Sequence, residues 1–271
     1  IFNNLSFSSN FAHSNSFSNG GAICYKKTNS KNSLSYANEY FSNCSFSCNK
    51  AFSNHTSKGG AIDISNDVNG NFINCTFTNC KSKYGGAVYI TNEKKCTTEI
   101  KNCIFQGCKS NAGGSIYMIS DECNTSISDC KFERNTASSE SGGSIYIKSK
   151  LISHFKFTNC LFERNSGYKI GGAIYFHSLI SSFEKCVFED NVVKFGGGAV
   201  ASSDSYISCA DCLFDKNKVI INSSSGSGAF TCGGAFLLDD KNATFERCNF
   251  TENFVEDKEP KSSLMHTNLG G

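Results

Sequence analysis

The chain has 271 residues, and 26 Lys and Arg against 24 Asp and Glu give it a formal net charge of +2. It has no basic run and no apolar run of about 18 residues, which argues against nucleic acid as a partner and against a membrane span in this segment. One proline, no tryptophan, 24 glycines and 24 phenylalanines indicate a uniform core rather than an ordinary enzyme domain.

A two-part motif recurs along the whole chain in strict alternation. Its first part, Cys-x-Phe, begins at Cys44, Cys75, Cys103, Cys130, Cys160, Cys186, Cys212 and Cys248. Its second part, a Gly-Gly pair, begins at Gly20, Gly59, Gly85, Gly113, Gly142, Gly171, Gly197, Gly233 and Gly270. Successive pairs lie 26 to 39 residues apart. Such a repeat predicts a solenoid in which each unit contacts its neighbours, so we expect one array over residues 1–271.

The units vary along the chain. The first is degenerate, with Leu5 where later units have cysteine. Polar or charged stretches near residues 24–40, 218–232 and 252–268 are expected to be loops. The chain opens within a unit and stops on a new Gly-Gly pair, so we interpret it as an excerpt of a longer protein.

Within a unit the side chains alternate with a period of two, which is typical of strands. Cys75 and Phe77 lie on one side and Thr76 on the other, while Ile90 alternates with Tyr89. A further apolar position precedes each cysteine. Three short strands per coil, with coils rising by about 4.8 Å, predict an all-β fold. We expect a right-handed parallel β-helix, or β-solenoid, of about eight to nine coils.

Stacked coils place like residues in columns along the axis. We expect one buried ring stack of Phe77, Phe105, Phe132, Phe162, Phe188 and Phe214. We also expect side-chain amides to hydrogen-bond from coil to coil in a column of Asn10, Asn49, Asn135, Asn165, Asn191, Asn217 and Asn253. The column cysteines are interpreted as buried thiols.

The repeats resemble those of the chlamydial polymorphic outer-membrane proteins and similar large surface proteins. Phe132 to Asn135 followed by Gly142 to Ile145 is one matching pair, although the cysteine before each Phe departs from that pattern. The resemblance implies an extracellular or cell-surface β-helix, either a rigid stalk, a surface adhesin or a fibre-forming segment, with no catalytic residue to transfer. A carbohydrate-binding module or a polysaccharide-active enzyme on the same fold is the alternative.

Two cysteine pairs occupy matching positions in successive coils. Cys96 with Cys123, and Cys80 with Cys108, are expected to have Cα atoms about 4.8 Å apart, inside the disulfide range of about 4.4–6.8 Å. We predict the disulfide Cys96–Cys123 and a second one, Cys80–Cys108. Either bond would imply an oxidising compartment.

Two surface columns are candidates for function. Tyr89, Tyr117, Tyr146 and Tyr175 are expected to lie outward as an aromatic binding face, or to stack on one another and stiffen the sheet. Glu133, Glu163, Glu189 and Asp215 form an acidic column beside basic residues. Glu133 and Glu163 are expected to lie near the separation of about 5–10 Å that the two catalytic carboxylates of a glycosidase have. The alternative is a solvated turn in which ion pairs balance these charges.

The sequence predicts no catalytic residue, no metal site and no cofactor. The expected partners are other coils of the same longer chain or end-to-end copies of it. Host or matrix glycans or proteins are further candidates.

Overall fold

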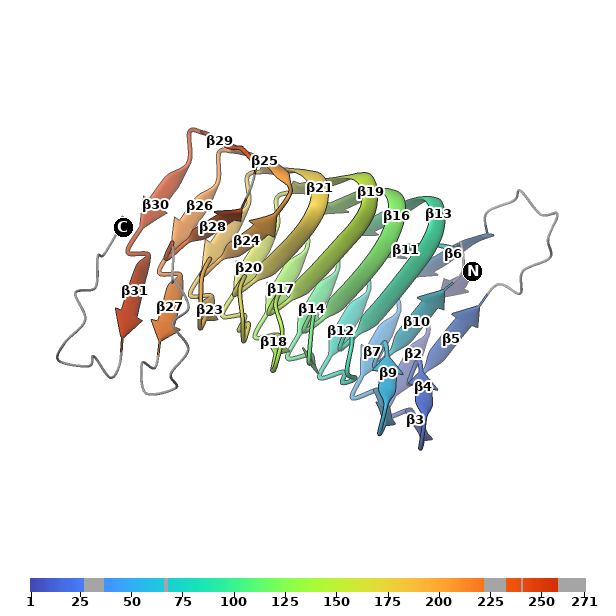
Figure 1. The fold of residues 1–271 in the computed structure, drawn as a ribbon. Helices are drawn as coiled ribbons and strands as arrows, with labels where there is room; N and C mark the ends of the chain where they lie inside the picture. The colour runs from blue at the N-terminus through green and yellow to red at the C-terminus, as the bar shows by residue number, and fades with distance from the viewer. Residues whose placement is uncertain (27–36, 66–67, 222–232, 240, 258–271) are drawn as a thin grey trace.

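The computed structural model describes residues 1–26, 37–65, 68–221, 233–239 and 241–257. In these ranges the chain is all β, and its parallel coils stack along one axis from the N-terminal to the C-terminal end (Figure 1). The predicted parallel β-solenoid is therefore confirmed. No helix long and apolar enough to cross a membrane occurs in the described ranges.

The Cys-x-Phe motif forms short strands of three residues that pair in parallel and in register. Phe therefore lies on Phe, and the ring centroids of Phe77 and Phe105 are 4.8 Å apart with 2° between their planes. All six rings of the predicted stack are fully buried, which confirms that prediction. The nine strands of this sheet are β2 (Ser6–Ser8), β7 (Ser45–Ser47), β12 (Thr76–Thr78), β14 (Ile104–Gln106), β17 (Lys131–Glu133), β20 (Leu161–Glu163), β22 (Val187–Glu189), β26 (Leu213–Asp215) and β30 (Asn249–Thr251).

A left-handed residue bounds each of these strands on both sides. Before β14, Asn102 has φ 52°, and after it Gly107 has φ 63°. Asn and Asp enter this region more readily than other non-glycine residues. This explains why the residue before the column cysteine is Asn or Asp in most coils. The left-handed residues at this corner are Asn4, Asn43, Asn74, Asn102, Asp129, Asn159, Lys185, Asp211 and Arg247.

The Gly-Gly pair leads into the longest strands. In the central coils, the strand that follows the Gly-Gly pair continues without a break into the strand that precedes the next Cys-x-Phe motif. The expectation of three short strands per coil is therefore wrong in these coils. The four long strands are β13 (Val88–Lys101), β16 (Ile116–Ser128), β19 (Ile145–Thr158) and β21 (Ile174–Glu184). Inward side chains continue through the bend, with Cys96 and Thr98 buried between Ile90 and Ile100, so pairing is not interrupted.

Towards both ends this side is divided into shorter strands. In one of these coils the divide falls beside Asp204, which has φ 51°. The divided strands are β1 (Phe2–Asn3), β5 (Ile23–Lys26), β6 (Ala37–Ser42), β10 (Ile62–Ser65), β11 (Val68–Ile73), β24 (Val200–Ser203), β25 (Tyr206–Ala210), β28 (Phe236–Asp239) and β29 (Ala243–Glu246).

The third side of each coil follows the asparagine column. Its strands are β3 (Phe11–Ser14), β4 (Phe17–Asn19), β8 (Lys50–Ser53), β9 (Thr56–Lys58), β15 (Lys109–Ser110), β18 (Thr136–Ala137), β23 (Val192–Val193), β27 (Lys218–Ile221) and β31 (Phe254–Asp257). In the first two coils, β3, β4, β8 and β9 form a lobe that projects from the stack near the N-terminal end (Figure 1).

The three predicted loops are shorter than expected. Strand β5 extends to Lys26 and β6 begins at Ala37, while β27 and β31 occupy the first residues of the other two regions. These segments pair in parallel with strands of neighbouring coils, so they belong to the stack. The rest of each predicted loop lies largely outside the described residues.

The asparagine column is a buried ladder, as predicted. The backbone N–H and Nδ2 of Asn165 both donate to Oδ1 of Asn191 at 3.0 Å. Nδ2 of Asn165 also donates to the carbonyl oxygen of Phe132 in the preceding coil at 2.9 Å. Each amide therefore joins three successive coils and fixes their register.

The Gly-Gly corner has two separate requirements for glycine. Gly171 has φ +71°, where a side chain is strained. A Cβ atom on Gly172 would lie 2.0 Å from the carbonyl oxygen of Gly198 in the next coil. The first glycine thus sets the turn, and the second allows neighbouring coils to approach.

Candidate functional site

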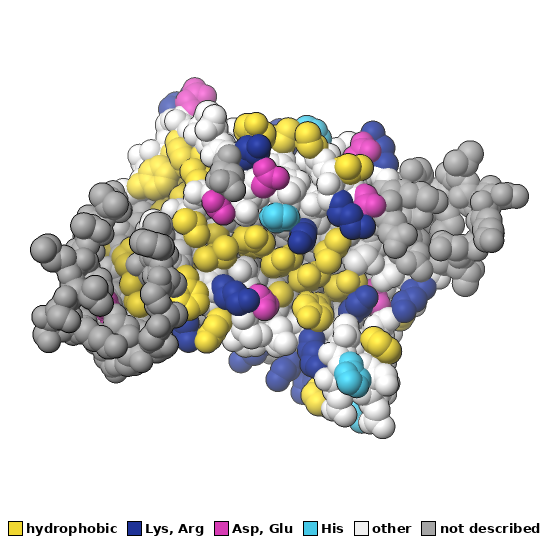
Figure 2. Space-filling model, in the orientation of Figure 1, with side chains coloured by type: hydrophobic (Ala, Val, Ile, Leu, Met, Phe, Trp, Pro, Cys, Tyr) yellow, Lys and Arg dark blue, Asp and Glu magenta, His cyan; other side chains and the backbone are white. Residues whose placement is uncertain are grey.

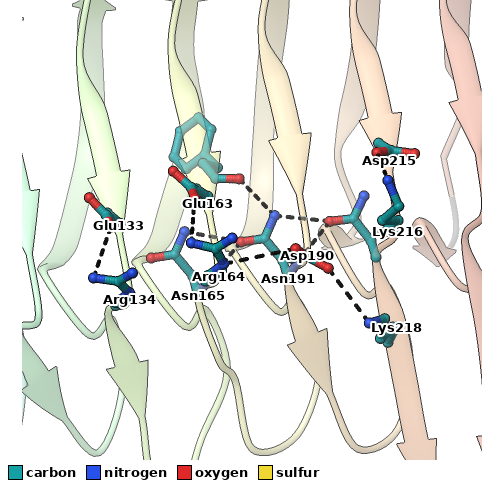
Figure 3. Close-up of polar contacts among 12 residues, drawn as sticks. Glu133, Arg134, Glu163, Arg164, Asn165, Asp190, Asn191, Asp215, Lys216 and Lys218 are labelled. Carbon is teal, nitrogen blue, oxygen red and sulfur yellow. Dashed lines mark hydrogen bonds and ion pairs between the residues drawn. The ribbon is translucent and has the colours of Figure 1, made fainter.

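The acidic column lies at the corner after the Cys-x-Phe strands, where basic residues face it (Figure 3). Nζ of Lys131 lies 2.9 Å from Oε2 of Glu133 and 3.3 Å from Oε2 of Glu163. Arg134 contacts Glu133 at 3.2 Å, and Arg164 contacts Glu163 at 2.9 Å. One lysine therefore bridges the two carboxylates that most resembled a glycosidase pair.

The electrostatics of this corner oppose a role in acid catalysis. The ammonium group of Lys131 holds the pKa of Glu133 below its usual value, although partial desolvation acts in the opposite direction. A glycosidase acid instead needs a carboxyl group with a raised pKa. The arrangement matches the solvated, ion-paired turn rather than a catalytic pair.

The next coils repeat this pairing. Asp190 lies between Arg164, at 3.9 Å, and Lys218, at 3.6 Å, and Asp215 contacts Lys216 at 3.0 Å (Figure 3). Opposite charges on neighbouring coils relieve the repulsion that a column of like charges would cause. This corner therefore balances its own charge in the coils that contain β17, β20, β22 and β26.

Of the two alternatives for the tyrosine row, the rings adopt the self-stacked arrangement and do not form an open aromatic face. Tyr89 is only 5% exposed, and Tyr117, Tyr146 and Tyr175 are half-buried. The rings of Tyr117 and Tyr146 stack at 4.7 Å, and Lys58 lies 4.7 Å above Tyr89. Burial raises the pKa of Tyr175. The rings cover each other's faces, which leaves little for a flat ligand to stack on.

Asp63 begins this row and is fully buried. Its Oδ1 accepts a hydrogen bond from Oγ of Ser65 at 2.6 Å, but its Oδ2 has no hydrogen-bond partner among the described residues. Burial raises the pKa of the Asp63 carboxyl, and Ser65, Lys58 and Lys26 offset this only in part.

We predict a pH-dependent effect for Asp63→Asn. With a raised pKa, the folded state holds this proton more tightly than the unfolded state does. The free energy of unfolding should therefore fall as the pH rises from the ordinary carboxyl range through the raised value. Thermal melts at pH 4 and pH 8 should show the variant gaining stability over the parent chain mainly at pH 8. An equal difference at both pH values would contradict the prediction.

Among the described residues, the cysteines divide into one disulfide and a set of thiols. Cys96 and Cys123 are joined, with Cα atoms 4.7 Å apart, and they face each other in the register of β13 and β16. Cys80 and Cys108 are free and buried, so the second predicted disulfide is wrong. Each of these thiols instead donates to a Phe carbonyl of the preceding coil, at 3.6 Å for Cys80 and 3.7 Å for Cys108. Burial raises the pKa of Cys108 and favours the neutral thiol.

A shallow groove of about 510 Å³ crosses the outer face of the long strands. Sequence reasoning missed it, because its hydroxyl and amide side chains form no conspicuous motif. Its lining includes Thr97, Asn124, His154 and Lys156, and Glu99 is its one carboxylate. The groove can hydrogen-bond a polar chain, but it does not assemble the two carboxylates that glycoside hydrolysis requires.

Sequence reasoning also missed a row of lysines. One lysine follows the asparagine position in each of three successive coils, and parallel β-bridges place these lysines side by side: Lys50, Lys81 and Lys109. All three are exposed, and in the described part of the chain none makes an ion pair. A lysine at the same position in three successive repeats was the available signal.

Comparison with known proteins agrees with this architecture. A family model described as "Right handed beta helix region" matches residues 84–257, which is more than half of the chain. The matched region contains six of the Gly-Gly pairs, from Gly85 to Gly233. No curated protein and no solved structure matches the chain. From the family match and the stacked parallel coils we conclude that the chain belongs to the right-handed β-helix family.

Proposed function

We propose that this β-helix is a structural or adhesive element outside the cell, acting as a rigid stalk or an adhesive surface. The observation that carries the proposal is the continuous core. Stacked Phe rings run from coil to coil, and the asparagine ladder joins the coils from Asn135 to Asn253. A body of this kind resists bending, because every coil is paired along its sides with the next. The resemblance of the repeats to those of polymorphic outer-membrane proteins favours the same role.

The disulfide supports an extracellular location. A bond between Cys96 and Cys123 persists in oxidising compartments and is rare in reducing ones. Most of the remaining thiols in the described chain are buried, which protects them from oxidation. The free cysteines are therefore compatible with the same environment.

Antibody labelling tests the location directly. An antibody raised against the purified chain should label intact cells that produce the protein as strongly as permeabilised cells. Labelling that appears only after permeabilisation would overturn the extracellular assignment. A cytosolic marker protein, detected in parallel, verifies that the cells are intact.

A second candidate function is carbohydrate binding, which the groove across the long strands favours. We expect no accompanying turnover, because the carboxylates Glu133 and Glu163 are bridged by Lys131. Incubation of the chain with neutral and acidic polysaccharides should release no new reducing ends and no unsaturated products. Turnover that disappears in Glu163→Gln but persists in Glu99→Gln would show that the acidic column is catalytic and would refute the structural assignment.

A further inference from the structure

The projecting lobe and the two coils after it share one exposed face, the Lys-aromatic face. Its residues are Phe11, His13, Lys50, Phe52, Lys81 and Lys109. The register of β3 and β8 places Phe11 beside Lys50 and His13 beside Phe52. Parallel bridges then continue from Lys50 to Lys81 and from Lys81 to Lys109. These residues thus lie side by side although they come from four successive coils.

The side chains of this face point away from the core. In β8, Lys50 and Phe52 are exposed, while the alternating Ala51 and Ser53 are buried. Phe11 is 61% exposed and Phe52 is 51% exposed. Figure 2 shows histidine and hydrophobic side chains at the surface of the projecting lobe. Large exposed aromatic side chains that gather at one place usually mark a site of interaction.

The aromatic part of the face is ordered by stacking. The ring of His13 lies between those of Phe11 and Phe52, with centroids 5.7 Å from each and nearly parallel planes. Two of the three rings, Phe11 and Phe52, are apolar, and Phe11 lies beside Lys50. A ligand that lies along the face would therefore meet rings first and then a line of ammonium groups.

Among the residues that the structure describes, no carboxylate forms an ion pair with the lysine row. A corner residue lies two positions before each of these lysines in the sequence. The three corner residues are Cys48, Asn79 and Gly107, and none of them is acidic. At the same corner of later coils, carboxylates accompany the cations, as Asp190 accompanies Arg164 and Lys218. Like charges in register on neighbouring strands repel each other. Three lysines in line without counter-charges therefore favour an anion supplied from outside.

We propose that the Lys-aromatic face binds a linear anionic polysaccharide. Its carboxylate or sulfate groups pair with Lys50, Lys81 and Lys109, and its sugar rings pack against Phe11 and Phe52. This inference rests on the adhesive role proposed above and gives that role a ligand class. A duplex nucleic acid fits the face less well, because its bases are paired and stacked on one another and cannot lie against Phe11 and Phe52.

Binding of defined polymers to the full chain tests this proposal. Heparin supplies sulfates, polygalacturonate supplies carboxylates, dextran is neutral, and a single-stranded oligonucleotide supplies phosphates. We expect binding of heparin, polygalacturonate or both that weakens as salt is added, and no binding of dextran. Preference between the first two identifies the anionic group. Tighter binding of the oligonucleotide than of either polysaccharide, or equal binding of dextran, would overturn the proposal.

Matched variants separate the row from overall charge. Replacing Lys50, Lys81 and Lys109 together by Gln should weaken polysaccharide binding by about tenfold or more. The control replaces Lys101, Lys148 and Lys194 by Gln, which removes the same charge from scattered exposed positions. It should change binding by less than about twofold, since exposed charges far from the ligand are screened. Equal losses in both triple variants would refute the site.

Two further measurements keep the outcome unambiguous. Phe52→Ala should weaken polysaccharide binding without reducing its dependence on salt, because it removes a stacking surface and no charge. Thermal melts should show that all variants remain folded, since the altered side chains lie at the surface. If no anionic polysaccharide binds while antibody labels intact cells, this inference fails and the extracellular structural role stands.

Discussion

Phe162→Ala is expected to lower the free energy of unfolding by about 3–5 kcal/mol. Phe162 is fully buried, and its ring stacks on those of Phe132 and Phe188, each with centroids 4.8 Å away. Removing the ring leaves a cavity, and neighbouring coils cannot close it because their backbones are held by β20 and its paired strands. Chemical denaturation of the parent and variant chains measures the difference.

The same column contains a natural control. Phe250 occupies the equivalent position in β30, where it contacts the ring of Phe214 on one side and is 47% exposed. Phe250→Ala should therefore cost about half as much or less, because less apolar surface leaves the core. Equal losses at the two positions would show that the ring stack is not the main source of stability.

Asn191→Leu is expected to be comparably destabilising. Oδ1 of Asn191 accepts hydrogen bonds from the backbone N–H and Nδ2 of Asn165, and its own Nδ2 donates to the carbonyl oxygen of Phe162. Leu has nearly the same shape but satisfies none of these buried groups. Each buried polar group left without a partner costs about 1–3 kcal/mol, so the total loss should be about 3 kcal/mol or more.

The chain itself suggests the control for this substitution. Cys80 and Cys108 stand in the asparagine column, and each thiol still donates to a Phe carbonyl of the preceding coil. Asn191→Cys should therefore destabilise less than Asn191→Leu, because one of the lost contacts is replaced. Denaturation curves of the two variants rank them, and a larger loss for the cysteine variant would contradict the ladder as the cause.

Side-chain columns were predictable because a solenoid is nearly one-dimensional. Once the period is known, residues at equal positions must stack, and Phe162 and Asn191 need no further information to be placed in their columns. The Cys96–Cys123 pair followed from the same spacing. The spacing does not determine whether two stacked thiols are joined or remain free, which is why Cys80 and Cys108 were wrongly paired.

The sequence by itself determined the fold class, the buried phenylalanine and asparagine columns and the glycine corner, since these depend on the repeat alone. Only the tertiary structure decided what covers each column. Tyr89 and Asp63 alternate with buried residues and looked exposed, yet both are buried. The Lys-aromatic face likewise appeared only when pairing brought Phe11 beside Lys50 and Lys50 beside Lys81. Exposure and charge balance depend on which neighbours face a side chain from other coils, and the pattern within one repeat does not contain that information.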